Sequence, residues 1–508
     1  MSYPEGTIEK DVIIIGAGIA GVCFAHRLQE RHPDLSYCIL EQRHELGGTW
    51  SLFKYPAIKN YYRCITNADI LLGIRCDSDL YTYGFPWNPW SENRALANGS
   101  TILEYMKQTC RQDGTDKHIL FEHKVENASW SSRTQTWSLQ VQHGIIGKTM
   151  RSRFVFLATG YFDHEQPLQA IIPGVEKFHG KIVHPQFWPE EFDYTNMDVV
   201  IIGSGATAIS LLPAMAGQAK HVTMLQRSPS YIMSIPLEGD WIERVTRAVV
   251  PAFLAARLVR LKWIVFPAIF RKFCTMFPSY ARQMMRKLTE PQLKQGVLVD
   301  PHFNPRYSPF EQRMCMCPDG DFYECLRTDE ASIKTGVIKD VISDSIHLES
   351  NEQLHADVII TATGLKLRVG GDINISIDGT PVKVNDRFVW RGLMFEEMPN
   401  LFFSFGYLDA SWTLGVDTSA QLACKVLSRM KRDDVGMVFP KRSEVEKQTM
   451  REVSIMPLTS TYVEKARADL PRVGDRAPWQ PRQPYLWEQL SLKTGDDFIG
   501  LECIRTNR

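Results

Sequence analysis

One short phrase occurs twice in the chain, and it constrains the fold more than any other feature. Residues 11–21 read DVIIIGAGIAG, and residues 198–208 read DVVIIGSGATA. Each copy begins with β-branched residues typical of a strand buried on both faces of a parallel sheet, and each continues through a glycine-rich turn into a helical pattern. The repeat predicts an α/β fold with two Rossmann-like domains.

The spacing of small residues in both turns predicts dinucleotide binding. The first position allows a tight turn, the second lets the backbone approach a pyrophosphate, and the third must be small so that the helix packs closely on the strand. The phosphates would then lie at the positive end of a helix. The residues are Gly16, Gly18 and Gly21 in the first turn, and Gly203, Gly205, Thr207 and Ala208 in the second.

The residue that ends the next strand distinguishes the two nucleotides. Glu41 follows residues 36–40, where an acid accepts hydrogen bonds from ribose hydroxyls and favours an adenosine without a 2′-phosphate. Arg227 follows residues 221–225, where a guanidinium suits a 2′-phosphate, although a lone arginine is often only a solvated surface group. We therefore expect FAD in the first unit and NADPH in the second, and an enzyme that transfers hydride.

The segment HELGGTW after Glu41 extends the expected flavin site. Its glycines give a backbone flexible enough to lie against a cofactor. We expect contacts to FAD from Gly48, Thr49 and Trp50.

Composition excludes several classes of protein. Hydrophobic residues make up 44% of the 508-residue chain and charged residues 23%, which suits a folded protein of about three units. The 58 basic residues balance the 58 acidic ones, so nucleic acid is not an expected partner. The 11 cysteines form no CxxC pair and no zinc-ligand spacing, which predicts reduced thiols in a cytoplasmic protein without a metal and without dithiol chemistry.

No stretch of the chain is expected to cross a membrane. The N-terminus has no basic segment followed by an apolar run, so we expect no secretory signal. The most apolar stretch, residues 247–273, is interrupted by Arg257, Arg260 and Lys262. A helix packed on its own protein is favoured there, with peripheral contact to a membrane surface as the alternative.

A twelve-residue segment before the second turn carries a family resemblance. Residues 178–189 read FHGKIVHPQFWP and match the pattern FxGxxxHxxxWP at every fixed position. The chain thereby resembles the Baeyer-Villiger monooxygenases, class B flavoprotein monooxygenases, in the branch of the bacterial enzyme that activates thioamide prodrugs. The likeness runs over nearly the whole chain. The matching residues are Phe178, Gly180, His184, Trp188 and Pro189.

The resemblance implies an activity and site residues. Such enzymes reduce FAD with NADPH, trap molecular oxygen as a C4a-peroxyflavin, convert ketones to esters or lactones, and oxidise sulfides. By resemblance, Arg313 is the active-site arginine that stabilises negative charge, and Asp77 is the carboxylate that pairs with it. His184 and Trp188 would act at the hinge between the nucleotide domains. Trp412 would either face the substrate or pack in the core.

The resemblance also implies how the chain divides. FAD would bind to a discontinuous domain of residues 1–166 and 360–508. NADPH would bind to residues 167–234 and 316–359. A helical insertion, residues 235–315, would cover the substrate pocket.

One departure from the family affects an active-site loop. Relatives carry an uninterrupted YPGxRxD, whereas here residues 57–72 separate Tyr55 and Pro56 from GIRCD at 73–77. Such an insertion is longer than most connections in a compact domain. It either bulges outward, reflects a gene-model error or retained intron, or silences the enzyme and leaves a flavin-binding protein. A flavin monooxygenase specialised for sulfur or nitrogen is a further alternative.

Overall fold

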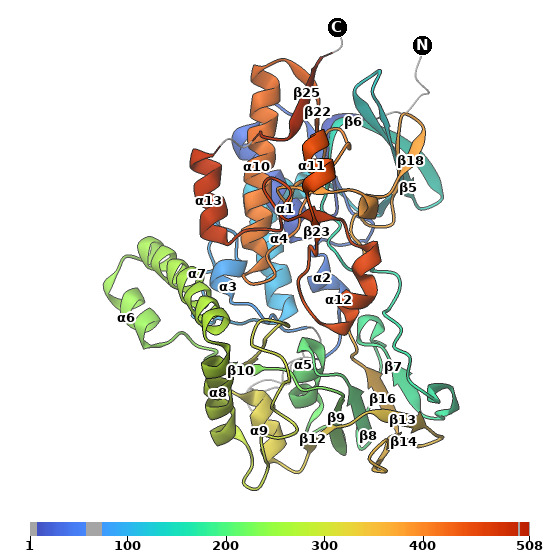
Figure 1. Cartoon of the computed structure of the whole chain (residues 1–508), viewed down its shortest axis with the longest axis vertical. Helices are drawn as coiled ribbons and strands as arrows, with labels where there is room; N and C mark the ends of the chain where they lie inside the picture. The colour runs from blue at the N-terminus through green and yellow to red at the C-terminus, as the bar shows by residue number, and fades with distance from the viewer. Residues whose placement is uncertain (1–7, 57–73, 496–497, 507–508) are drawn as a thin grey trace.

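The computed structural model describes residues 8–56, 74–495 and 498–506 (Figure 1). The insertion at 57–72 lies outside these residues. In Figure 1 one sheet with its helices occupies the upper half of the molecule and a second sheet the lower half, while a pair of helices projects to one side.

The first sheet has eleven strands and contains the first copy of the repeat. Its main path runs β18-β17-β4-β5-β6-β1-β2-β3, and β21 pairs with β6, β20 with β21 and β19 with β20. Strand β1 lies parallel to β2 and β6. The strands are β1 (Ile8–Ile15), β2 (Tyr37–Leu40), β3 (Ile119–Leu120), β4 (His123–Ser131), β5 (Thr136–His143), β6 (Ile146–Leu157), β17 (Asn374–Ile377), β18 (Thr380–Val382), β19 (Val389–Trp390), β20 (Met394–Phe395) and β21 (Leu401–Phe403).

The second sheet has five strands in the order β12-β9-β8-β16-β7, and every pair in it is parallel. It contains the second copy of the repeat. Its strands are β7 (Lys181–Val183), β8 (Asp198–Ile202), β9 (His221–Gln226), β12 (Ala331–Thr335) and β16 (Val358–Thr361). The smaller sheets consist of β10 (Ile232–Ile235), β11 (Cys315–Pro318), β13 (Ile338–Val341), β14 (Ser345–Leu348), β15 (Gln353–His355), β22 (Val435–Pro440), β23 (Glu452–Val453), β24 (Val473–Gly474) and β25 (Leu501–Arg505).

The β-branched runs are buried on both faces of each sheet. Along β1, Val12 and Ile14 belong to one apolar cluster, and Ile13 and Ile15 to the cluster on the opposite face. Strand β8 divides its residues in the same way between two further clusters. Successive side chains of a strand point to opposite faces, so an uninterrupted apolar run needs helices or loops over both. The α/β fold predicted from the repeat is confirmed.

Helices cover these sheets. Helix α1 follows β1 and packs against α10, while α5 follows β8. The helices near the two sheets are α1 (Ile19–Arg31), α2 (Thr49–Leu52), α3 (Leu80–Tyr83), α4 (Gly99–Asp113), α5 (Ala206–Met215), α9 (Asp321–Arg327), α10 (Trp412–Arg432), α11 (Glu444–Thr449), α12 (Thr461–Ala466) and α13 (Tyr485–Thr494).

A helical lobe lies between β10 and β11. It consists of α6 (Trp241–Val249), α7 (Ala252–Met276) and α8 (Pro278–Thr289), and α6 and α7 form the projection in Figure 1. The helical region ends sooner than the sequence pattern suggests, because residues 293–314 contain neither helix nor strand. Within the described parts of the chain, no helix combines the length and apolarity needed to cross a bilayer.

Candidate active site

The first glycine of each turn lies against the end of a neighbouring strand. Gly16 has φ of +108°, and a Cβ atom built on it would lie 2.6 Å from the carbonyl oxygen of Ala158. Gly203 has φ of +146°, and its Cβ would lie 2.2 Å from the carbonyl oxygen of Ala362. Both distances are too short for a carbon–oxygen contact, and both φ values favour glycine. The two turns therefore share one construction.

The third position differs between the turns. A Cβ on Gly21 would lie 2.0 Å from the carbonyl oxygen of Gly16, whereas Ala208 holds the equivalent place in α5 and is fully buried. Helix α1 therefore packs closer to its turn than α5 does. The second positions also differ, because a Cβ on Gly18 would meet Gly48 at 3.6 Å, while nothing lies within 4 Å of one on Gly205.

Glu41 fastens the first turn to the loop that follows β2. Its side chain is buried and accepts hydrogen bonds from the backbone N–H of Ala17 at 2.8 Å and of Arg43 at 3.0 Å. Arg43 donates to the carbonyl of Gly48 at 2.8 Å. The carboxylate thus organises the wall of the site, which the ribose argument from the sequence did not anticipate.

A cavity of about 1590 Å³ opens beside this turn. Its lining includes residues of the first turn, of the loop around Gly48, of the segment that leads into β11, and of the helical lobe. A glycine-rich turn at the N-terminus of α1 and two facing glycine backbones fit a pyrophosphate, so the residues present suit FAD. The predicted residues that line the cavity are Gly16, Gly18, Glu41, Gly48, Thr49, Trp50, Asp77, Arg313 and Trp412.

Arg313 enters the same cavity. Its Nη2 donates a hydrogen bond to the hydroxyl of Tyr161 at 3.1 Å, and its Nε is buried without a hydrogen-bond partner. The neighbouring phenol of Tyr161 raises the pKa of Arg313, with burial opposing and with Tyr462 and Asp77 adding to the rise. Tyr161 stacks on Trp412, with ring centroids 4.5 Å apart. The cation of Arg313 therefore lies in the wall of the cavity, with an unpaired Nε–H behind it.

The direct pairing of Asp77 with Arg313 that the resemblance implied is not found, because no ion pair joins these two residues. The ion pair in this loop belongs to Arg75, which contacts Asp321 of α9 at 2.6 Å. Arg75 is buried and Asp321 is partly buried, and burial raises the pKa of Asp321 against the effect of Arg75. Sequence reasoning missed Arg75, although its position two residues before Asp77 was a signal. Asp77 lines the cavity and acts on Arg313 through space.

The second turn lies largely outside this cavity, where only its Ala206 contributes to the lining. Arg227 is exposed and donates to the hydroxyl of Thr461 in α12 at 2.9 Å. The hydroxyl of Tyr55 donates to Thr207 at 3.4 Å. Tyr55 thus contacts the second turn itself, and Thr461 contacts the arginine that follows β9.

The residues of the FxGxxxHxxxWP segment do not line the cavity. Phe178 and Trp188 are buried in apolar clusters of the second half. A Cβ on Gly180 would lie 2.3 Å from the carbonyl oxygen of Asp357. Partly buried Pro189 follows Trp188. These four residues pack the segment onto the second sheet.

His184 occupies the middle of that segment. Its Nδ1 accepts from the backbone N–H of Gln186 at 3.2 Å, its Nε2 is buried without a partner, and burial lowers its pKa. Gln186 in turn donates to the carbonyl of Asp163 at 2.7 Å, in the connection between the halves. His184 is therefore a neutral group near a junction, away from Arg313.

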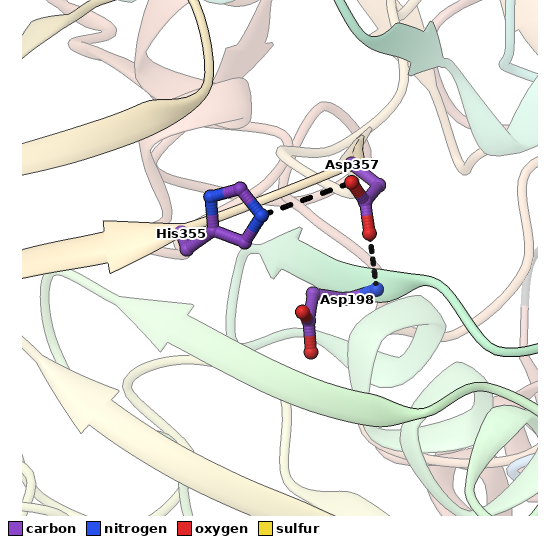
Figure 2. A group of neighbouring side chains, drawn as sticks. All are labelled: Asp198, His355 and Asp357. Atoms are coloured by element: carbon purple, nitrogen blue, oxygen red, sulfur yellow. Dashed lines mark hydrogen bonds and ion pairs between the residues drawn. The ribbon is translucent and has the colours of Figure 1, made fainter.

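Figure 2 shows the one group in the described residues whose side chains could in principle converge on a metal ion: Asp198, His355 and Asp357. Asp357 accepts from the backbone N–H of Asp198 at 2.8 Å, and Lys220 pairs with the Asp198 carboxylate at 2.6 Å. His355 and Asp357 are exposed. These contacts account for the group, which is empty of any ion and remote from the cavity lining.

Comparison with known proteins places the chain. Residues 13–252 match the model of the pyridine nucleotide-disulphide oxidoreductase family. All ten cysteines that the structure describes are free, so these offer no redox disulfide. The chain is 40% identical over 493 residues to the FAD-containing monooxygenase EthA of Mycobacterium tuberculosis (strain ATCC 25618 / H37Rv), covering 96% of each protein. It is 37% identical over 493 residues to the probable FAD-binding monooxygenase AlmA of Acinetobacter baylyi, covering 96% of this chain and 95% of the relative.

Solved structures share the fold. A steroid monooxygenase bound to NADP matches with a TM-score of 0.72 and 19% identity, over 98% of this chain and all of the other. Cyclohexanone monooxygenase from Rhodococcus sp. Phi1, bound to NADP+, matches with a TM-score of 0.71 and 18% identity over the same shares. The identity and coverage of the relatives settle the assignment: this chain belongs to the family of FAD-containing monooxygenases.

Proposed function

We propose that the chain is an NADPH-dependent Baeyer-Villiger monooxygenase that converts ketones to esters or lactones and also oxidises sulfides. The observation that carries the proposal is the partly buried Arg313, held by Tyr161 in the cavity that begins at the first glycine-rich turn. The fold shared with ketone and steroid monooxygenases supports it.

The protein's contribution is electrostatic. When bound, FAD and NADPH supply the electrons that activate molecular oxygen. Arg313 stabilises the negative charge that develops on oxygen during attack on a carbonyl carbon, since its guanidinium stays charged and its Nε has a free donor. Tyr161 fixes the orientation of that guanidinium, and the Asp77 carboxylate tunes it from across the cavity.

We assign the nucleotides as the sequence suggests. FAD contacts the first turn, Glu41 and the Gly48–Trp50 segment, while NADPH contacts the second turn and Arg227. The FAD domain comprises residues 1–166 and 360–508, and the NADPH domain residues 167–234 and 316–359, although β16 continues across the boundary to Thr361.

The remaining parts of the proposal concern the junction between the two domains, the cover of the substrate pocket and contact with a membrane. His184 and Trp188 couple the two domains, and residues 235–315 cover the substrate. We propose a cytoplasmic enzyme whose 247–273 region contacts a membrane peripherally, as the exposed apolar side chains of α7 support.

Substitution of Arg313 tests the proposal. In purified holoenzyme, Arg313→Ala should lower kcat for ester formation from a ketone by about 100- to 1000-fold while FAD stays bound. Arg313→Lys should recover only part of the loss, because an ammonium keeps the charge but lacks the planar, fixed fork of guanidinium donors. The measurements are product analysis by gas chromatography and mass spectrometry, flavin absorbance and NADPH consumption.

Three outcomes contradict the proposal in different ways. Unchanged ester formation in Arg313→Ala removes the role of this residue. Wild-type enzyme that yields only sulfoxides or N-oxides is a sulfur or nitrogen monooxygenase. Wild-type protein that binds FAD but consumes no NADPH with any ketone or sulfide is a flavin-binding protein inactivated by the insertion at 57–72.

A further inference from the structure

The helical lobe exposes apolar side chains that a packed helix would bury. Of the 25 residues of α7, only Ala255, Val259 and Cys274 are buried. Exposed aromatic and aliphatic side chains continue onto α6, α8 and α13. Phe253 is 69% exposed, Trp241 72% and Trp487 67%. Exposed apolar side chains gathered in this way on neighbouring helices indicate an interaction site.

This surface surrounds the mouth of the cavity. Several side chains are exposed to solvent and also line the cavity, so they form its rim. The exposed rim residues are Ile242, Phe266, Met276, Leu288, Leu486 and Trp487. Whatever covers the lobe therefore also covers the entrance to the site of Arg313.

The charge of the lobe indicates what that partner is. Residues 241–289 contain ten basic side chains and one acidic one, the buried Glu243, in a chain whose net charge is zero. Arg257, Lys272 and Lys287 are exposed and make no ion pair with any described residue. Cations beside bulky apolar side chains are typical of surfaces that lie on anionic lipid. A second copy docked by the same face would bring these cations against each other.

We propose that α6, α7, α8 and α13 form a lipid-docking surface that seats the cavity mouth on an anionic bilayer. The apolar rim enters the lipid boundary, and the cations contact the headgroups. An apolar substrate then passes from the bilayer into the cavity without crossing water. This last step rests on the proposed enzymatic activity, whereas the docking deepens the peripheral membrane contact proposed above for residues 247–273 and is measured without turnover.

Vesicle sedimentation with the full-length holoenzyme tests the docking. The protein should sediment with vesicles of phosphatidylcholine and phosphatidylglycerol, less with phosphatidylcholine alone, and less again as salt is raised. Lys272→Glu should weaken binding by at least about fivefold, since each cation contributes roughly that factor. Lys339→Glu is the matched control, since Lys339 is an exposed residue of β13, and this variant should bind as wild type does.

A second pair of variants tests the contribution of apolar side chains to vesicle binding. Phe253→Ser should reduce vesicle binding, whereas Ile145→Ser should not, because Ile145 is 99% exposed on the β5–β6 turn. Both variants should keep the wild-type rate of NADPH oxidation with a small water-soluble ketone in the absence of vesicles. If the wild-type protein oxidises no NADPH with this ketone, the proposed function is wrong. The docking is then still decided by the sedimentation result.

Two results would overturn the docking. One is equal sedimentation of the protein with and without anionic vesicles. The other is a dimer in sedimentation velocity that Phe253→Ser dissociates while vesicle binding is absent, because the lobe is then an interface between copies. Passage of substrate from the bilayer into the cavity has its own test. Anionic vesicles should speed turnover of a long-chain ketone by the wild-type enzyme more than by Lys272→Glu. Equal acceleration of both would contradict passage from the bilayer.

Discussion

The two halves of the molecule repeat one motif but enclose it differently. The first turn opens into a cavity of about 1590 Å³ and is fastened by the buried Glu41, whose carboxylate accepts from two backbone N–H groups. The second turn contributes only Ala206 to this cavity, and the strand after its helix is followed by Arg227, an exposed side chain with one neutral hydrogen-bond partner. The first site is thus enclosed and fastened by its own side chains, as suits a retained cofactor. The second is open, as suits a cosubstrate that exchanges in each turnover.

The tightness of helix packing follows the same division. At the third position of the first turn only glycine fits, whereas the second turn accommodates Ala208 without conflict. A close helix brings its N–H groups nearer to a bound pyrophosphate. Tight packing and enclosure therefore occur together in the flavin half.

Substitution of the third residue of the first turn should have the largest effect on the difference between the two halves. Gly21→Ala places a Cβ 2.0 Å from the carbonyl oxygen of Gly16, so α1 must move away from β1. We expect loss of bound FAD and destabilisation by roughly 3 kcal/mol, as for overpacking of a core. Flavin absorbance and thermal unfolding measure these effects.

The reverse exchange is the control. Ala208→Gly should cost about 1 kcal/mol of stability through the helix propensity of glycine, and FAD should remain bound. If the two variants lose equal amounts of FAD, the difference in packing between the halves has no bearing on flavin retention.

Removal of the fastening carboxylate should have the next largest effect. Glu41→Ala leaves the N–H groups of Ala17 and Arg43 without their acceptor, and FAD should bind about 10- to 100-fold more weakly. Glu41→Gln keeps one acceptor oxygen and should lose less. Fluorescence titration of apoprotein with FAD measures both. A weakening by Glu41→Ala of NADPH binding alone would reverse the assignment of the two sites.

Sequence reasoning predicted the repeated units well because their physics is local. Strand burial, turn geometry and helix contact all act within about ten residues, so the spacing of Gly16 to Gly21 carries the information. The sequence predicted Glu41 as a ribose-binding carboxylate, which stays a prediction, and its bonds to Ala17 and Arg43 were not predictable because they depend on how the loop folds back.

Contacts between distant segments were not predictable in this way. Arg75 pairs with Asp321, 246 residues further along the chain, and Arg313 contacts Tyr161, 152 residues away. No periodicity relates such residues, because the two sheets and their connections decide which side chains meet. The resemblance pointed to Asp77 and Arg313, and the fold brings both to one cavity without an ion pair between them.

Arg227 offers the smallest and most selective test of the comparison. Its guanidinium lies at the open edge of the second site, so Arg227→Ala should raise KM for NADPH by about 10- to 100-fold, the range for a lost hydrogen bond to a charged group. KM for NADH should stay unchanged, because NADH has no 2′-phosphate for the guanidinium to bind. The FAD content should also stay unchanged, since the flavin half keeps all its contacts. Steady-state kinetics with both nucleotides separate this prediction from a general loss of stability, which would raise both KM values or lower kcat. Equal changes for NADPH and NADH would mean that Arg227 only fastens α12 through Thr461, and that another residue reads the 2′-phosphate.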